Sequence, residues 1–242
     1  MFPSTFLIIS FAVTALSRPT ERQTSGVITS CTVPNTAAIT FDDGPYIYSE
    51  QIVDTPDTNN VTATFFVNGC IYDDASVQAL KNAYSKGHQI SSHTWVHKDL
   101  ATLTLSEVDD EFTQVDKALE SILGVKTAFM RPPFGSYSDT VLQVANAHNQ
   151  SVIIWDFDSG DSVGESATQS NAEYDALVAS HPNTILTLNH ETYDSTVTTV
   201  LPHAIEVLQG AGYSLVTVAE CLGLAPYSSI GEAGAKDATW TC

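Results

Sequence analysis

The sequence predicts an α/β protein: a distorted β/α barrel of about seven parallel strands in a single domain. Short apolar or β-branched runs alternate with longer amphipathic stretches along the chain. The short runs are apolar at nearly every position, as expected of strands covered on both faces. No internal repeat, low-complexity tract or linker divides the chain. This pattern favours one parallel sheet surrounded by helices.

The predicted elements follow one another in strict alternation. The predicted strands are 37–42, 62–67, 88–92, 127–131, 151–157, 184–189 and 213–218. The predicted helices are 47–54, 74–86, 104–123, 138–149, 169–180 and 197–210. The clearest helix begins with a capping box from Thr104 to Glu107 and ends at Gly124. Its apolar face carries Val108, Phe112, Val115, Leu119 and Ile122.

The first residues are typical of an export signal. An apolar run at 6–15 precedes the small residues Ala15 and Ser17, and it is too short to span a bilayer. No Lys or Arg precedes the run, and a buried first strand or helix is the alternative. We expect a signal peptide at 1–17, a short pro-segment to about residue 30, a folded domain at 31–223 and a C-terminal tail at 224–242. The expected product is a secreted, extracellular monomer without a membrane anchor.

The charge balance excludes two classes of partner. The chain has 9 Lys and Arg against 28 Asp and Glu, a formal net charge of −19. Nucleic acids and anionic lipid surfaces are bound through clustered basic residues, and the sequence has no such cluster. The 43% of hydrophobic residues can form a sizeable core, which excludes disorder. A neutral or cationic partner is favoured.

The four cysteines predict two disulfides, because an even number outside C-x-x-C pairs is typical of exported proteins. Four cysteines permit three connectivities, and the residues by themselves leave all three open. Sequons at 60–62 and 149–151 predict glycosylation in the same exported context.

Two neighbouring carboxylates end the first predicted strand. Asp42 and Asp43 precede Gly44 and Pro45, a composition that is also typical of a solvated turn. Consecutive side chains point in different directions, so one carboxylate can bind a metal while the other acts on water or substrate.

The third predicted strand is followed by two histidines. His93 and His97 are four residues apart, which places both on one face of a helical turn within reach of one Zn²⁺. Such spacing also occurs by chance in a chain with seven histidines. Asp43 would be a third ligand, leaving a fourth position for water as in catalytic zinc sites.

Three weaker signals follow the next strands. Arg131 begins R-P-P-F-G, acidic residues occupy 156–161, and His190 follows the sixth strand. Each by itself is typical of a surface turn, a solvated loop or a hydrogen-bonded histidine. Together, at the ends of successive β/α units, they indicate one site at the carboxyl edge of the strands.

The set of motifs resembles that of the polysaccharide deacetylases of carbohydrate esterase family four, especially the secreted fungal chitin deacetylases. The resemblance spans roughly residues 31–223 and implies a distorted β/α barrel. It also implies metal-dependent hydrolysis of N-acetyl groups on the N-acetylglucosamine units of chitin or its oligosaccharides, giving chitosan and acetate. The matching motifs are T-F-D-D-G-P at 40–45, H-T-x-x-H at 93–97, R-P-P-F-G at 131–135, D-x-x-D at 158–161 and L-x-H at 188–190.

The resemblance assigns a role to each matching residue. Asp42 would be the general base, oriented by Arg131, and His190 the general acid, oriented by Asp161. The Phe134 backbone N–H would complete an oxyanion hole. One divalent metal, normally Zn²⁺ with Co²⁺ as the alternative, would be held by Asp43, His93 and His97.

The same resemblance places Leu188 at the acetyl pocket. The family usually has Trp where this chain has Ser162, so we expect another wall from Trp95 or Trp155, with Tyr46 as a further substrate contact. The resemblance to the fungal members also favours a disulfide between Cys31 and Cys221, which lie near the two ends of the domain. That leaves Cys70 for Cys242.

Two alternatives lie within the family: an esterase that removes O-acetyl groups from xylan, and a peptidoglycan N-deacetylase. A third belongs to another class, an inactive chitin-binding protein. The intact Asp42, Arg131 and His190 argue against a binding protein, because binding requires neither a base nor an acid.

Overall fold

The computed structural model describes residues 26–242, so the expected signal peptide at 1–17 lies outside the described residues. The central sheet is parallel at every pairing. Its strands are, in spatial order, β1 (Val27–Ile28), β8 (Ser151–Ile153), β7 (Phe129–Met130), β5 (Gln89–Ser92), β4 (Thr64–Val67), β3 (Thr40–Gly44), β10 (Thr184–His190), β2 (Thr36–Ala38) and β11 (Ser214–Val216), with β9 (Phe157–Asp158) paired to β10.

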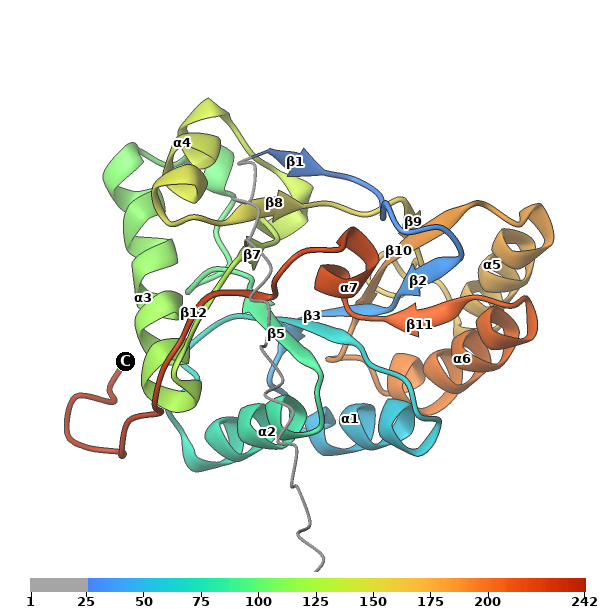
Figure 1. Ribbon diagram of the computed structural model, residues 1–242, viewed down its shortest axis with the longest axis horizontal. Helices are drawn as coiled ribbons and strands as arrows, with labels where there is room; N and C mark the ends of the chain where they lie inside the picture. The colour runs from blue at the N-terminus through green and yellow to red at the C-terminus, as the bar shows by residue number, and fades with distance from the viewer. Residues whose placement is uncertain (1–25) are drawn as a thin grey trace, which may run out of the picture.

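The six longest helices lie around the outside of the strands (Figure 1). They are α1 (Ser49–Thr58), α2 (Asp74–Ser85), α3 (Leu105–Leu123), α4 (Asp139–Ala147), α5 (Ala167–Ser180) and α6 (Leu201–Gly210). Four shorter helical segments connect the larger elements: η1 (Leu100–Thr102), η2 (Pro133–Gly135), η3 (Thr196–Val200) and α7 (Val218–Leu222).

The parallel α/β fold predicted from the sequence is confirmed, although several predicted strands are interrupted. The strand predicted at 37–42 is divided at Ile39 into β2 and β3, the strand predicted at 151–157 is divided into β8 and β9, and the strand predicted at 127–131 is interrupted at Ala128. Within residues 26–242, no hydrogen-bonded pairing joins the edge strands β1 and β11, so backbone hydrogen bonds do not close the barrel. The carboxyl ends of the central strands nevertheless meet at one edge, where the site described below is formed.

Helix α3 shows how local sequence sets an element. The Thr104 side chain accepts a hydrogen bond from Glu107 N, and Glu107 accepts one from Thr104 N in return. Gly124 ends the helix in the left-handed region, with φ of 74°. The predicted apolar face is buried. It packs against the neighbouring α2 and α4 and against the sheet.

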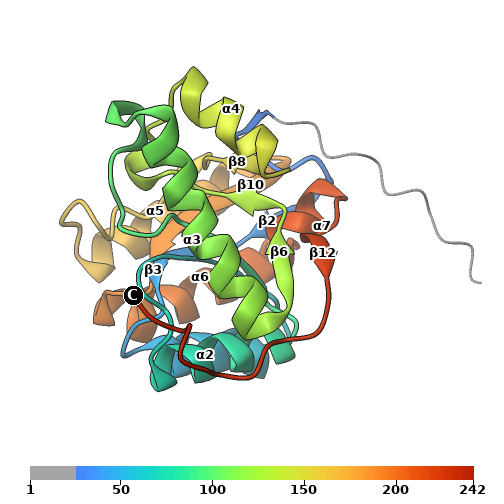
Figure 2. The same ribbon diagram turned by 90° about the vertical axis from the view of Figure 1, so that its left-hand side faces the viewer.

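Both chain ends differ from the expected terminal extensions. Val27 and Ile28 form the edge strand β1. In the tail, β12 (Tyr227–Ile230) pairs antiparallel with β6 (Val125–Thr127), and Figure 2 shows the chain continuing past α3 toward α2. Trp240 is buried, and its ring lies 5.6 Å from that of Tyr72. The tail is therefore packed onto the domain.

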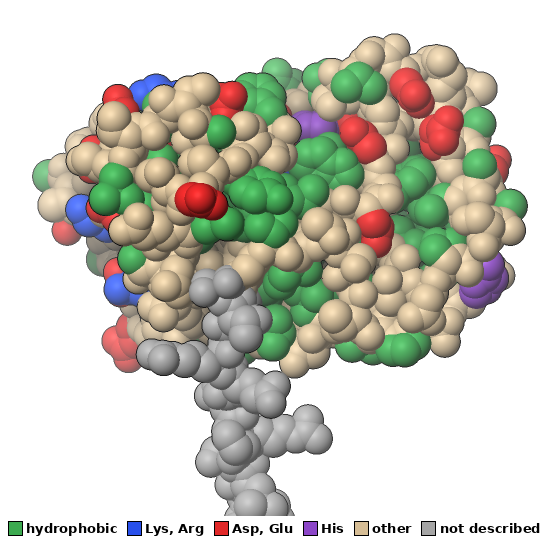
Figure 3. Space-filling model, turned by 90° about the horizontal axis from the view of Figure 1, so that it is seen from above, with side chains coloured by type: hydrophobic (Ala, Val, Ile, Leu, Met, Phe, Trp, Pro, Cys, Tyr) green, Lys and Arg blue, Asp and Glu red, His purple; other side chains and the backbone are tan. Residues whose placement is uncertain are grey.

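The structure contains the disulfides Cys31–Cys221 and Cys70–Cys242, as the resemblance favoured. Both sequon asparagines, Asn60 and Asn149, are exposed. None of the helices within residues 26–242 has the length and apolar character needed to cross a membrane. In the view from above, acidic side chains are spread across the surface, whereas the few basic ones lie toward its left side (Figure 3).

Candidate active site

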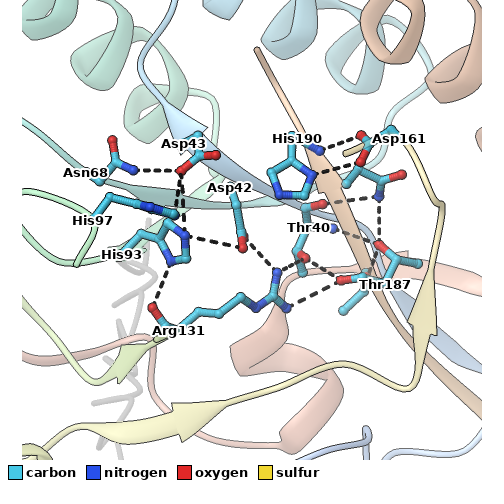
Figure 4. Close-up of polar contacts among 12 residues, drawn as sticks. Thr40, Asp42, Asp43, Asn68, His93, His97, Arg131, Asp161, Thr187 and His190 are labelled. Atoms are coloured by element: carbon cyan, nitrogen blue, oxygen red, sulfur yellow. Dashed lines mark hydrogen bonds and ion pairs between the residues drawn. The ribbon is translucent and has the colours of Figure 1, made fainter. Parts of the chain in front are cut away.

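Residues from separate strand ends converge on one cleft (Figure 4). Strand β3 carries Asp42 and Asp43, the segment after β5 carries His93 and His97, and β10 ends with His190. Arg131 follows β7, and Asp161 follows β9. The cleft has a volume of about 420 Å³. Its lining is made by Asp42, Asp43, His93, His97, Phe134, Trp155, Asp158, Ser162, Val163, Leu188, His190 and Tyr193.

Three of these side chains could hold a metal ion. Asp43 Oδ1 lies 3.6 Å from His93 Nε2 and 3.3 Å from His97 Nε2, and one ligand atom from each residue falls within 4.8 Å of the others. Two imidazoles and a carboxylate are a donor set that suits Zn²⁺. The residues present therefore fit a divalent metal.

Neighbouring groups orient the potential metal-binding atoms of His93 and Asp43. His93 Nδ1 lies 2.8 Å from the Arg131 carbonyl oxygen, so a proton on Nδ1 leaves Nε2 free as a ligand. Burial lowers the pKa of His93 despite the nearby carboxylates of Asp42 and Asp43, which favours the neutral ring that metal binding requires. Asn68 donates a hydrogen bond of 2.7 Å to Asp43 Oδ1. Asn68, one residue beyond β4, was not predicted from the sequence as part of the site.

Asp42 is held by a buried arginine. Arg131 Nη1 lies 2.8 Å from Asp42 Oδ1 and 2.6 Å from Thr40 Oγ1, and the arginine side chain is completely buried. Its guanidinium also stacks 4.3 Å from the Phe66 ring centroid. Burial lowers the pKa of Arg131, while the Asp42 charge acts in the opposite direction. Breaking such a buried pair costs about 3–5 kcal/mol, so Asp42 is firmly oriented.

On the opposite side of the cleft, His190 is fixed by Asp161. Its Nδ1 lies 2.8 Å from Asp161 Oδ1, and its backbone N–H donates to Oδ2 at 2.7 Å. Thr196 Oγ1 donates a second hydrogen bond of 2.8 Å to Oδ2. Burial lowers the pKa of His190, but the hydrogen bond and charge of Asp161 and the charges of Asp42 and Asp43 outweigh it, so the net pKa is raised.

The structure separates the two tryptophans considered for the pocket wall. Trp155 lines the cleft, and a Cβ at position 135 would lie 3.0 Å from its ring, so Gly135 lets the R-P-P-F-G turn approach the indole. Trp95 does not line the cleft: its side chain is only 7% exposed and packs toward Tyr72. The interpretation of Trp95 as a substrate contact is therefore not supported, because the loop turns its indole into the core.

The remaining predicted substrate contacts also occupy different places. Leu188 lines the cleft, whereas Tyr46 lies outside its lining with a half-exposed ring. Two lining residues were missed, Val163 and Tyr193, which are 74% and 40% exposed. Val163 directly follows Ser162 and Tyr193 lies three residues after His190, but only the fold shows that both face the same cleft as Leu188.

The turn after Asp43 is held by a buried carboxyl group that was not predicted from the sequence. Glu191 accepts hydrogen bonds from Tyr46 N at 3.1 Å and from Ser49 Oγ. A Cβ at position 44 would lie 2.1 Å from Glu191 Cδ, so Gly44 makes room for this carboxyl group. Burial raises the pKa of Glu191 to about 7. The signal was available: an acidic residue directly follows the mainly apolar strand that ends in His190.

The sequence pattern of the family described as polysaccharide deacetylase matches residues 29–153. The chain belongs to the polysaccharide deacetylase family. This agrees with the convergence of the motif residues in one cleft, and the similarity to known members shows that the protein is a deacetylase enzyme.

Individual members of the family are similar over most of this chain. A chitin deacetylase of Pestalotiopsis sp is 39% identical over 211 residues, covering 84% of this chain and 70% of the relative. A probable peptidoglycan-N-acetylglucosamine deacetylase of Arthroderma benhamiae is 37% identical, covering 81% of this chain and 46% of the relative. The solved chitin deacetylase of Colletotrichum lindemuthianum has a TM-score of 0.79 at 29% identity, covering 84% of this chain and 93% of that structure.

Proposed function

We propose that this protein is a secreted, metal-dependent chitin deacetylase. It hydrolyses the N-acetyl groups of N-acetylglucosamine units in chitin or its oligosaccharides, releasing acetate and leaving glucosamine units. The observation that carries the proposal is the arrangement of three groups around one cleft: the metal triad, the Asp42–Arg131 pair and the His190–Asp161 pair. The similarity to chitin deacetylases supports this choice of substrate.

Asp43, His93 and His97 would hold a divalent metal, most simply Zn²⁺. As a Lewis acid, this metal would make the acetyl carbonyl carbon more electrophilic and lower the pKa of a water molecule. The ligand set leaves room for substrate and water, as in catalytic zinc sites.

Asp42 is the proposed general base. Its Oδ2 lies 3.7 Å from His93 Nε2, close to the metal ligands, while Oδ1 is occupied by Arg131. In this arrangement Asp42 accepts the proton from the attacking water, and Arg131 prevents the carboxylate from rotating away. The Phe134 backbone N–H stabilises the negative charge on the former carbonyl oxygen.

His190 is the proposed general acid. Amide hydrolysis requires protonation of the departing nitrogen, because an amine anion is a very poor leaving group. The raised pKa of His190 keeps a larger fraction of the ring protonated, and Asp161 aims its free Nε2 at the cleft. Leu188 and Trp155 provide an apolar wall for the acetyl methyl group.

Peptidoglycan N-deacetylation is the second candidate, favoured by the Arthroderma benhamiae relative. The same groups would act on the same N-acetylglucosamine unit in a different polymer. Acetate release from chitin oligosaccharides, peptidoglycan and acetylated xylan, measured side by side, distinguishes the substrates. Release from chitin oligosaccharides that is unaffected by a strong chelator would contradict the metal-dependent mechanism.

The base is tested by Asp42→Asn. We expect kcat to fall by roughly 10²–10⁴-fold, the usual contribution of a general base. Asp54→Asn is the control, since Asp54 is an exposed carboxylate on α1 paired with Lys86. Thermal melts of both variants separate a loss of chemistry from a loss of folded protein. Near wild-type kcat in Asp42→Asn would refute the role of this residue.

A further inference from the structure

We propose that Glu111, in the middle of α3, is a positioning residue that holds the loop between the two metal-binding histidines. The proposal rests on the metal site proposed above and adds a residue from outside the five family motifs. Glu111 is only 4% exposed, although it carries a carboxylate. Such a residue is rarely buried without partners that satisfy its charge.

The partners of Glu111 are backbone amides of the histidine loop. Its Oε2 accepts hydrogen bonds from Trp95 N and Val96 N, both at 2.8 Å. Among residues 26–242 no basic side chain forms an ion pair with Glu111, so these two amides are the donors that meet its charge. Consecutive N–H groups that point to one anion form a nest, a known anion-binding turn.

The loop adopts a backbone conformation that requires such support. Thr94 has φ of 70° and His97 has φ of 54°, both in the left-handed region. That region is unusual for residues other than glycine, and most of all for a β-branched residue such as Thr94. The Thr94 hydroxyl is also buried without a hydrogen-bond partner. The hydrogen bonds to Glu111 offset this strain, because they form only when the amides of Trp95 and Val96 face α3.

The two histidines depend on the loop to different degrees. His93 is buried and has its own anchor at the Arg131 carbonyl oxygen. His97 has a side chain that is 31% exposed, and its ring contacts His93, Phe134 and the Asp43 carboxylate but has, in the described part of the chain, no backbone anchor like that of His93. Release of the loop from Glu111 would therefore displace His97 more than His93 and weaken metal binding without removing a ligand.

The test measures Zn²⁺ affinity by competition with a chromophoric chelator, at fixed pH, for wild type, Glu111→Ala and Glu111→Gln. We expect about 10–100-fold weaker binding for Glu111→Ala, as for the loss of other groups that orient metal ligands. Gln has the same size and keeps one acceptor oxygen, so Glu111→Gln should bind more tightly than Glu111→Ala but more weakly than wild type. Glu120→Gln is the matched control, on the exposed face of the same helix.

A further variant separates loop support from general destabilisation of α3. Glycine adopts the left-handed region without strain, so Thr94→Gly in the Glu111→Ala background should recover part of the lost Zn²⁺ affinity. Thermal melts without metal show whether each variant folds. If Glu111→Ala does not fold, the Zn²⁺ affinity of Glu111→Gln alone provides the test. Wild-type Zn²⁺ affinity in folded Glu111→Gln and Glu111→Ala would overturn the proposal. No Zn²⁺ binding by the wild-type protein would instead overturn the metal site, and this proposal with it.

Discussion

Two histidine–aspartate pairs in this protein have almost the same geometry but different surroundings. His190 Nδ1 lies 2.8 Å from Asp161 in the cleft, and His148 Nδ1 lies 2.7 Å from Asp116 between α3 and α4. The opposite nitrogen of His148 lies 3.1 Å from Asp109. Within the described residues, no carboxylate pairs with Nε2 of His190, and the His190 side chain lines the cleft.

The difference shows what makes a histidine available for chemistry. Both rings have a raised pKa: the hydrogen bond to Asp116 is the largest cause for His148, whereas Asp161, Asp42 and Asp43 together overcome burial for His190. A nearby carboxylate therefore does not mark an active-site histidine. A second ring nitrogen left free in a cleft does, because that nitrogen can deliver a proton to a substrate.

The sharpest test replaces each histidine with glutamine. His190→Gln should lower kcat by roughly 10²–10⁴-fold, since the leaving nitrogen loses its proton donor. His148→Gln should leave kcat within about twofold, because His148 does not line the cleft. Initial rates on an N-acetylglucosamine oligomer provide the measurement. Equal losses in the two variants would remove the distinction between the pairs.

Replacing the carboxylates gives a smaller effect. Asp161→Asn should lower kcat by roughly 10–100-fold, since a neutral acceptor orients the ring less firmly. It should also lower the pKa of His190, so activity that requires the protonated ring should be lost at lower pH than in wild type. A pH–rate profile measures the shift. Asp116→Asn is the control and should leave the profile unchanged; a profile that stays fixed in Asp161→Asn would argue against the His190 assignment.

The His148 pair should instead affect stability. Because the folded-state pKa of His148 is raised, its stabilising effect is fully present below its unfolded pKa of about 6.5 and is lost as pH rises through the folded pKa. His148→Gln should therefore cost about 1–3 kcal/mol at pH 5.5 and less at pH 8.5. Denaturant unfolding at both pH values provides the check, and an equal cost at both would contradict the linkage.

The smallest effect is expected at Asp109. Its side chain is 54% exposed, so Asp109→Asn should change the free energy of unfolding by no more than about 0.5 kcal/mol. The Asp116 side chain is only 15% exposed and also accepts a hydrogen bond of 2.7 Å from Gln150, so Asp116→Asn should cost more free energy of unfolding. The same unfolding experiment compares the two variants. A larger loss of unfolding free energy in Asp109→Asn than in Asp116→Asn would contradict the expectation that the less exposed carboxylate contributes more.

Much of the candidate site was predicted from the acidic residues and histidines that follow the predicted strands. In a parallel α/β fold the carboxyl ends of the strands share one edge, so local sequence was sufficient to bring Asp42, Asp43, His93 and His190 together. Helix α3 was likewise predicted within one residue, because its cap and its ending glycine lie in the helix's own sequence. The apolar spacing of α3 even contained an unused signal: Glu111 lies on the same face as Val108 and Val115.

Tertiary contacts decided what local sequence left open. Trp95 and Trp155 both follow strands, but the loop held by Glu111 buries Trp95 near Tyr72, whereas Trp155 faces the cleft. The tail likewise is placed on the domain by its contacts with β6, Tyr72 and Cys70. The sequence by itself determined the parallel α/β order and the chemical groups at the strand ends, because periodicity, caps and motif residues are local properties. Only the tertiary structure decided which tryptophan lines the cleft, which histidine keeps a free nitrogen and which glutamate accepts hydrogen bonds from the loop between His93 and His97, because each depends on segments far apart in the chain.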